Sequence, residues 1–254
     1  MKVATPLSTL IKNASEGDMK KILGLSDALE GREHIVSVES DLPHLYHCEL
    51  SIIVPWDEHV FQEAVATIHR HEAILTSFHV LSCYVSPEIK EGRFYPNGEH
   101  MSEKEMLKNA ENNIGRMRQM FPDMEILIEN NNYFSTGAYE TVTTPAFLAK
   151  LSKAIGVNLL LDIGHAEISA KHQGITLDQY VAALPLGKVR QIHLSGISRG
   201  GREYGDAHEV LTTEDWKNFE RISAVCPTLE FVTIEYYKDA SCLIEMLTKL
   251  KSYI

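Results

Sequence analysis

Short apolar runs rich in valine, isoleucine and leucine recur along the chain, and stretches with helical spacing separate them. Runs of this length and composition predict β-strands. The predicted strands are His34–Ser40, Tyr46–Val54, Ala73–Val80, Met124–Asn130, Val157–Ile163, Val189–Gly196 and Phe231–Tyr237, with a weaker candidate at Lys2–Leu7. Several runs are almost entirely apolar, which is typical of parallel strands that are covered on both faces.

Helix start signals stand between most of these runs. In the clearest case, Ser102 is followed three residues later by Glu105, which is the capping-box pattern. Thr144 precedes Pro145 at the start of a segment that ends at Gly156. The predicted N-caps are Asp57, Ser102, Thr144, Thr176, Thr212 and Asp239.

The alternation of strands with helices indicates βαβ units and a parallel sheet. Eight such units in about 250 residues is the size of a (β/α)8 TIM barrel. An open doubly wound sheet would show a glycine-rich turn after its first strand, and the sequence has none there. No linker interrupts the chain, so we predict a single TIM-barrel domain over residues 1–254. The segment Ser40–Tyr46 is too short for a helix, so we expect an irregular N-terminal part.

Charge, apolar runs and cysteine spacing indicate which classes of binding partner and which cellular compartment to expect. The 24 Lys plus Arg against 35 Asp plus Glu leave a formal charge of −11, which argues against nucleic acid. No apolar run approaches the length that spans a bilayer, and the N-terminus lacks the apolar region of a signal peptide. The four cysteines are widely spaced, as reduced thiols are. We expect a cytoplasmic protein with a small-molecule or peptide substrate and no membrane partner; the oligomeric state stays open.

Polar side chains end five of the predicted strands: His79, Glu129, Asp162, His193 and Glu235. Carboxylates and imidazoles bind divalent metals. The last four lie 33, 31 and 42 residues apart, and each interval is about one βα unit. Successive members therefore come from successive strands and meet at the mouth where barrel enzymes keep their chemistry.

Further donors lie close to these strand ends. His165 follows Asp162 by three residues, and Asp206 and His208 occupy alternate positions in the segment 197–211. A single histidine or aspartate at a strand end is usually a surface or capping residue. A set of such donors at barrel spacing is harder to obtain by accident, and burying many carboxylates without cations costs several kcal/mol per charge. The predicted metal ligands are His79, Glu129, Asp162, His165, His193, Asp206, His208 and Glu235.

Three other residues are candidate substrate contacts. Asn130 adjoins Glu129, and it fits a turn as well as a binding role. Arg199 and Arg202 form a basic pair in a glycine-rich segment near the predicted mouth. They would hold an anionic group of the substrate or be solvated, and the sequence does not separate these two interpretations.

The motifs IEN, LLLDIGHA, QIHLSG, GDAHEVL and TIEYY follow in that order and resemble the xylose-isomerase-like TIM barrels, which include sugar epimerases and endonuclease IV. Within that superfamily, residues 129–216 are most similar to the multinuclear non-haem iron-dependent oxidative enzymes. The N-terminal half carries the resemblance weakly, because SFHVLSCYVS keeps His79 but lacks the family's glycines.

The resemblance implies two or three divalent metal ions, with iron first and manganese, zinc or cobalt as alternatives. It also implies catalytic roles for Glu129 and Glu235 and an O2-dependent oxidation of a peptide thiol. The main alternative is a sugar or sugar-phosphate isomerase or epimerase, in which a strand-end glutamate acts as base and Arg199 or Arg202 neutralises a phosphate. A zinc-dependent phosphodiesterase like endonuclease IV, and a barrel that only binds a partner, are weaker alternatives.

Overall fold

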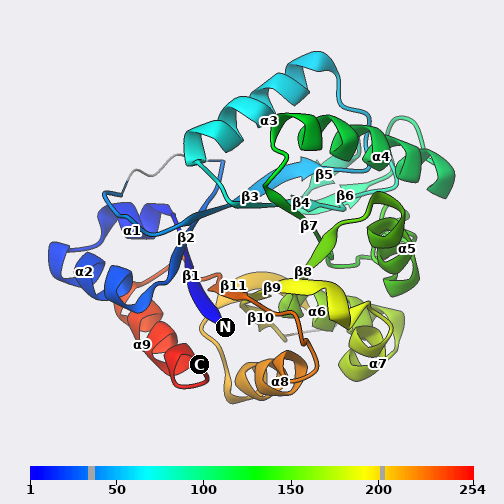
Figure 1. The fold of residues 1–254 in the computed structure, drawn as a ribbon. Coiled ribbons are helices and arrows are strands. Elements are labelled where there is room, and N and C mark those ends of the chain that lie inside the picture. The colour runs from blue at the N-terminus through cyan, green and yellow to red at the C-terminus, as the bar shows by residue number, and fades with distance from the viewer. Residues whose placement is uncertain (34–37, 201–203) are drawn as a thin grey trace.

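The computed structural model describes residues 1–33, 38–200 and 204–254. Within these ranges, eight parallel strands close into a barrel with helices outside it (Figure 1). The order around the barrel is β1-β12-β9-β8-β7-β4-β3-β2. The strands are β1 Lys2–Pro6, β2 Ala28–Gly31, β3 His44–Ser51, β4 Leu75–His79, β7 Glu125–Glu129, β8 Asn158–Asp162, β9 Val189–Leu194 and β12 Phe231–Ile234. The predicted (β/α)8 fold is confirmed.

Nine α-helices in the described ranges pack around this barrel. They are α1 Thr9–Asn13, α2 Glu16–Leu25, α3 Glu58–His71, α4 Glu103–Met120, α5 Pro145–Ile155, α6 Ile163–Gln173, α7 Leu177–Ala182, α8 Thr213–Ser223 and α9 Ala240–Lys251, with a 3-10 turn at Leu186–Lys188. Each of the six predicted N-cap side chains accepts a hydrogen bond from a backbone N–H in the first turn of its helix. The capping box of Ser102 and Glu105 is also present.

The N-terminal part differs from the prediction. The second barrel strand is Ala28–Gly31, which pairs with β1 and β3, and not His34–Ser40. Residues 34–37 lie outside the described residues, and residues 38–40 have no regular structure. The segment 28–31 is short and carries a glutamate and a glycine, which are rare in strands, so burial between its neighbours decides its conformation. Helices α1, α2 and α6 were not predicted.

The barrel interior consists of two layers with different chemistry. Side chains two positions apart on a strand share a face, so each strand sends alternate residues inward. The apolar layer is the buried cluster of Ala4, Ala28, Leu45, Leu75, Leu127, Leu160 and Phe231. Two positions further along their strands lies the polar layer, which is also buried: Glu30, His47, Ser77, Glu129, Asp162 and Thr233, with His193 at the corresponding level of β9.

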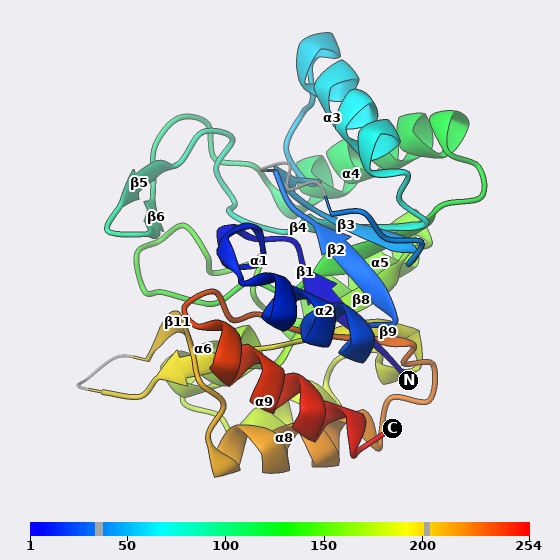
Figure 2. The same ribbon diagram turned by 90° about the vertical axis from the view of Figure 1, so that its left-hand side faces the viewer.

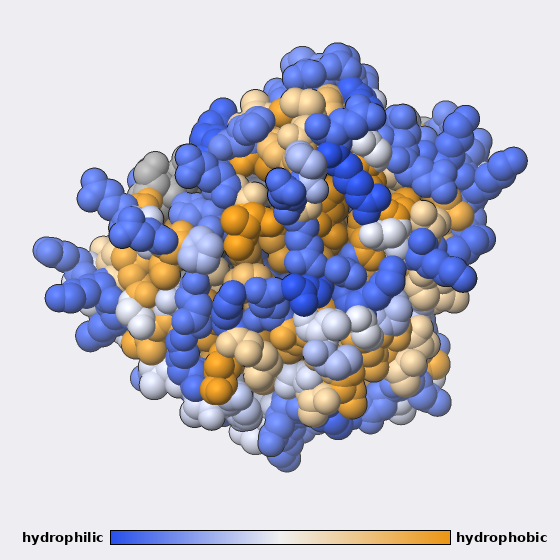
Figure 3. All heavy atoms as spheres, in the orientation of Figure 1, coloured by the Kyte–Doolittle hydropathy of each residue, from blue (hydrophilic) through white to orange (hydrophobic). Residues whose placement is uncertain are grey.

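Two antiparallel hairpins lie at the C-terminal end of the barrel, where the polar layer is. They are β5 Glu88–Lys90 with β6 Arg93–Tyr95, and β10 Gly196–Ser198 with β11 Gly205–Glu209. Figure 2 shows these hairpins at one end of the barrel and both chain termini at the other. On the face of the barrel that carries the N-terminus, hydrophilic and apolar residues are interspersed (Figure 3). No helix among the described residues is long and apolar enough to cross a membrane.

Candidate metal centre

Three groups of potential metal ligands meet in and just above the polar layer. Within each group, the donor atoms lie within 4.8 Å of one another. The groups are Glu129–Asp162–His165, His47–Glu49–His79 and Glu30–His193–Glu235, and every member except Glu49 is buried. Six of the eight predicted ligands belong to these groups, so the structure brings together side chains from β4, β7, β8, β9 and the end of β12, as the strand-end spacing predicts.

Glu129 occupies the middle of the three groups. Its Oε2 atom lies 2.7 Å from His79 Nδ1 and 3.7 Å from His47 Nε2. Its Oε1 atom lies 3.4 Å from His193 Nδ1 and 3.8 Å from His165 Nδ1. Burial alone would raise the pKa of this carboxyl, but the positive charge on His79 holds it well below its usual range. A carboxylate with imidazoles on both oxygens is placed to bridge two cations.

Asp162 and His165 are positioned by the start of α6. Asp162 is the N-cap of this helix, and its Oδ1 accepts a hydrogen bond of 2.6 Å from the backbone N–H of His165. The other oxygen, Oδ2, is buried and has no hydrogen-bond partner. Burial raises the pKa of Asp162, and the charge of His165 offsets part of this effect, with a result of about 6.

Asn130 ties two strand ends together. Its side-chain Nδ2 donates to the backbone oxygen of Asp162 at 2.9 Å, and its Oδ1 accepts from the Asp162 backbone N–H at 2.9 Å. The backbone oxygen of Asn130 lies 2.9 Å from His165 Nδ1. The amide predicted as a substrate contact therefore fixes the positions of two ligands, and a direct substrate role stays a prediction.

The second group contains two histidines in direct contact. His47 Nε2 and His79 Nε2 are 2.9 Å apart, and His47 Nδ1 lies 2.8 Å from Ser77 Oγ. Glu49, with a side chain 58% exposed, reaches His79 Nε2 at 3.5 Å. Burial and the charge of Arg32 lower the pKa of His47 to about 3. His47 is therefore in the neutral form that binds metals.

Asp206 and His208, both predicted ligands, lie beside these groups on β11. Asp206 Oδ2 is 3.4 Å from His165 Nε2, and His208 Nε2 is 3.3 Å from Glu235 Oε2. His208 has a backbone φ of 45°, which is uncommon for a residue other than glycine. Local strain of this kind often marks a functional position.

Sequence reasoning missed Glu30, His47 and Glu49. His47 and Glu49 lie in the first half of the predicted strand Tyr46–Val54, whereas ligands were predicted only at the C-terminal ends of strands and in the segments that follow them. Glu30 lies in a segment that was not predicted to be a strand. The signal was the two-residue alternation, because each buried polar residue follows an apolar one by two positions, as His47 follows Leu45.

The donor set fits divalent cations. Four buried ligand atoms in the centre have no hydrogen-bond partner: His79 Nδ1, Glu129 Oε2, Asp162 Oδ2 and His193 Nδ1. His79 Nδ1 and Glu129 Oε2 lie close together without the geometry of a hydrogen bond. Buried polar atoms without partners are costly and rare. Nitrogen and oxygen donors that face one another in this way are suited to iron, manganese, zinc or cobalt.

A cavity of about 350 Å³ adjoins the centre. His79, His165 and Asp206 reach it from the metal-ligand side. Its other walls come from the β5–β6 hairpin and the segment after β7, and they include Arg93, Phe94, Asn131, Phe134 and Tyr139. The guanidinium carbon of Arg93 lies 4.4 Å from the centre of the Phe134 ring. A substrate in this cavity would meet aromatic walls on one side and candidate metal ligands on the other.

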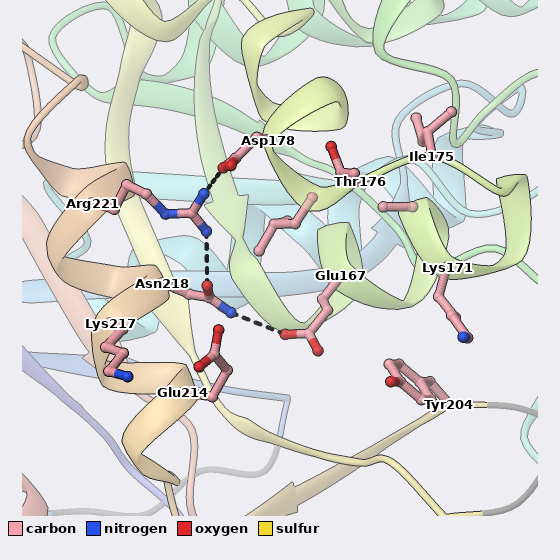
Figure 4. Close-up of a pocket in the computed structure, with 12 residues that line it drawn as sticks. Glu167, Lys171, Ile175, Thr176, Asp178, Tyr204, Glu214, Lys217, Asn218 and Arg221 are labelled. Carbon is pink, nitrogen blue, oxygen red and sulfur yellow. Dashed lines mark hydrogen bonds and ion pairs between the residues drawn. The ribbon is translucent and has the colours of Figure 1, made fainter.

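The predicted arginine pair is placed differently. The guanidinium of Arg199 pairs with two carboxylates, those of Glu167 at 2.8 Å and of Asp215. Arg202 lies outside the described residues. A larger cavity, of about 670 Å³, is lined by residues of α6, α7 and α8, among them Glu167 (Figure 4). The residues that line it include none of the candidate ligands.

A closed (β/α)8 barrel with clustered nitrogen and oxygen donors at its C-terminal end defines the class as a TIM-barrel protein with a candidate metal centre. Solved structures share this fold. A D-tagatose 3-epimerase-like protein superposes with a TM-score of 0.63 at 17% identity, over 100% of this chain and 97% of the other. Endonuclease IV from Thermus thermophilus superposes with a TM-score of 0.60 at 16% identity, over 100% of this chain and 98% of the other. At these identities the likeness concerns the fold alone.

The family follows from the sequence. The model of the RiPP precursor modification enzymes MbnB/TglH/ChrH matches residues 29–251, and the chain belongs to this enzyme family. A UPF0276 protein of Caulobacter vibrioides (strain NA1000 / CB15N) is 37% identical over 96 residues, which cover 37% of this chain and 34% of the relative. A UPF0276 protein of Anaeromyxobacter sp. (strain Fw109-5) is 30% identical over 130 residues, which cover 48% of this chain and 46% of the relative. The matches thus span a third to a half of these relatives. The predicted resemblance is confirmed.

Proposed function

We propose that the protein is a metal-dependent oxidative enzyme that modifies a cysteine thiol of a peptide, with O2 as the oxidant. The observation that carries this proposal is the position of Glu129, which faces four imidazoles and retains a buried oxygen without a hydrogen-bond partner. The family description supports a peptide as substrate, since RiPP precursors are peptides. A cytoplasmic location and the absence of a nucleic-acid partner stay predictions.

One set of residues in the centre would bind the metal ions, and the residues of the adjoining cavity would bind the substrate. Glu129, Asp162 and His165 would hold one ion, and His47, Glu49 and His79 a second, with Glu129 between them. Iron bound there would supply the redox chemistry, although the donors also suit manganese, zinc and cobalt. Asn130 and the N-terminus of α6 keep Asp162 and His165 in position.

The cavity supports a peptide side chain as the bound group. Phe94, Phe134 and Tyr139 provide apolar walls that exclude water from a residue lying against His79 and His165. Arg93 adds a positive charge at the same opening. In the reaction, O2 takes up the electrons that the peptide loses, so oxygen consumption and peptide modification must occur together.

The isomerase alternative has less support. It assigned a substrate phosphate to Arg199 or Arg202, and the guanidinium of Arg199 is already paired with Glu167 and Asp215. The phosphodiesterase alternative requires a strongly basic groove, whereas the chain carries a formal charge of −11. Neither alternative is favoured by a specific contact among the described residues of the centre.

The test is reconstitution with Fe(II) without air, followed by a pool of cysteine-containing peptides and then O2. We expect oxygen uptake and a mass change in cysteine peptides, and neither in the same peptides with serine in place of cysteine. Glu129→Gln should abolish both signals. Glu167→Gln, a matched change in the outer cavity, should preserve them. Iron-loaded protein that consumes no oxygen and leaves every peptide unchanged contradicts the proposal, and exchange of a ketose α-proton with solvent deuterium would favour the isomerase.

A further inference from the structure

The third ligand group differs from the other two because an arginine lies within it. Arg32 follows β2, and its side chain is 17% exposed. Its guanidinium lies 2.8 Å from Glu30 Oε1 and also forms an ion pair with Glu235. Both carboxylates of the third group therefore already share a positive charge that belongs to the protein.

Glu30 is also saturated with hydrogen bonds. Its Oε2 atom accepts a bond of 3.0 Å from Thr233 Oγ1 and a further bond from Gln191 Nε2. His193 Nε2 lies 3.0 Å from the same oxygen. With Arg32 on Oε1, each oxygen of Glu30 has its partners within the protein.

Glu235 is satisfied in a similar way. The hydroxyl of Tyr237 donates to its Oε1 at 3.2 Å, beside Arg32, and its Oε2 lies 3.3 Å from His208 Nε2. The buried ligand atoms without partners belong to His79, Glu129, Asp162 and His193, and no oxygen of Glu30 or Glu235 is among them. Three of these atoms belong to the first two groups, and the fourth, His193 Nδ1, lies 3.4 Å from Glu129 Oε1. The buried ligand atoms without partners therefore lie around Glu129.

We propose that the guanidinium of Arg32 takes the place of a third metal ion, so that this protein holds two metal ions and not three. A divalent ion bound by Glu30 and Glu235 would meet a fixed positive charge on the same oxygens. This inference rests on the proposed function, because it takes the other two groups to be metal sites.

The arrangement also gives Glu30 a different task. With Nε2 directed at Glu30, His193 presents its unpartnered Nδ1 to Glu129 Oε1 at 3.4 Å and to Glu235 Oε1 at 3.3 Å. The Glu235 oxygen already has Arg32 and Tyr237 as partners, whereas no arginine or lysine among the described residues pairs with Glu129. A carboxylate behind a histidine fixes its tautomer and its orientation toward a metal. Glu30 is therefore a positioning residue, and His193 serves the ion held by Glu129.

The test counts bound metal by elemental analysis, after loading with excess Fe(II) or Mn(II) without air and desalting. We expect two equivalents in the wild-type protein and three in Arg32→Gln, which removes the charge and keeps a polar side chain. Arg199→Gln is the matched control, because Arg199 is also held by two carboxylates, those of Glu167 and Asp215, and neither belongs to a ligand group. It should bind two equivalents.

Three equivalents in the wild-type protein would overturn this inference and leave the proposed function intact, as would two equivalents in Arg32→Gln. No bound metal in the wild-type protein would overturn both. If Arg32→Gln does not fold, Arg32→His should bind three equivalents and Arg32→Lys two. Anomalous diffraction from the wild-type protein provides an independent readout, because a peak between Glu30 and Glu235 contradicts the inference without any variant.

Discussion

The apolar and polar layers of the barrel are formed by the same strands, and on a strand that contributes to both, the polar residue lies two positions after the apolar one. On β7, Leu127 belongs to the apolar layer and Glu129 to the polar layer, and both are buried. On β8, Leu160 and Asp162 repeat the pattern. Burial stabilises the first member of each pair through the hydrophobic effect, whereas it is costly for the second.

Stability and chemistry are therefore separated along the barrel axis. The apolar layer, with the larger core between the barrel and its helices, holds the strands in register. The polar layer brings buried carboxylates and imidazoles together. Without cations, its carboxylates would repel one another or remain unpaired. Changes in the two layers should have separable effects on folding and on metal binding.

The largest effect is expected from Leu127→Ala in the apolar layer. Removal of a fully buried leucine side chain should lower the free energy of unfolding by about 2–5 kcal/mol. The folded variant should bind the same number of metal ions as the wild-type protein. Urea unfolding measures the stability, and elemental analysis measures the metal content. A loss of metal with unchanged stability would contradict the assignment of stability to the apolar layer and of metal binding to the polar layer.

Glu129→Gln, two residues along the same strand, should do the opposite. It keeps the shape of the side chain and removes the charge that His79, His165 and His193 face. We expect metal affinity to fall by at least about a hundredfold, since a shared ligand is lost, while the metal-free protein stays folded. Competition with a chelator measures the affinity. Wild-type affinity in this variant would show that Glu129 is not a ligand.

A smaller effect is expected from Ser77→Ala, which removes the partner of His47 Nδ1. Loss of a hydrogen bond that orients a metal-binding histidine should weaken metal binding by about tenfold. Thr76→Ala is the control, because Thr76 is the preceding residue on β4 and its hydroxyl donates to the sulfur of Met124. Equal affinities in the two variants would contradict a role for Ser77 in the centre.

The smallest effect concerns the end of the barrel away from the metal centre. Asp27 accepts hydrogen bonds from Lys251 Nζ and the Val3 backbone N–H, and these outweigh burial and lower its pKa. A lowered pKa stabilises the folded state above the unfolded value of 3.8, and this stability is lost as the pH falls through the folded value.

Lys251→Met should therefore cost up to about 1 kcal/mol at neutral pH, and the difference from wild type should shrink toward about pH 2. Urea titrations at both pH values measure it. Lys249→Met, on the same helix and stacked over Trp216, should show no such dependence on pH. Metal content should be unchanged in both variants, and a loss of metal would link the two ends of the barrel.

The strand-end pattern was sufficient to predict the barrel and the approach of Asp162, His165 and His193 to Glu129. Sequence spacing assigns Glu129, Asp162 and His193 to successive strands, and His165 follows Asp162 by three residues. The position of β2 could not be predicted in this way. Its four residues are buried through pairing with β1 and β3, a tertiary effect that local composition does not reveal. Consequently Glu30 and Arg32 were missed, although Arg32 changes what the third ligand group can bind.

The prediction for Arg199 had a different weakness. Its place near the mouth was inferred from a loop position, but the carboxylates of Glu167 on α6 and Asp215 on α8 determine where its guanidinium lies. Partners that are distant in sequence cannot be identified from one chain. The same holds for His47, whose contact with His79 depends on the pairing of β3 with β4.

All of these expectations depend on the polar layer being a metal centre organised by Glu129. Anomalous diffraction from crystals of the protein loaded with manganese locates the bound ions without any variant. We predict a peak within bonding distance of Glu129, Asp162 and His165 at the C-terminal end of the barrel. Well-ordered crystals in which manganese binds only at the outer surface, with no peak beside Glu129, would contradict this assignment.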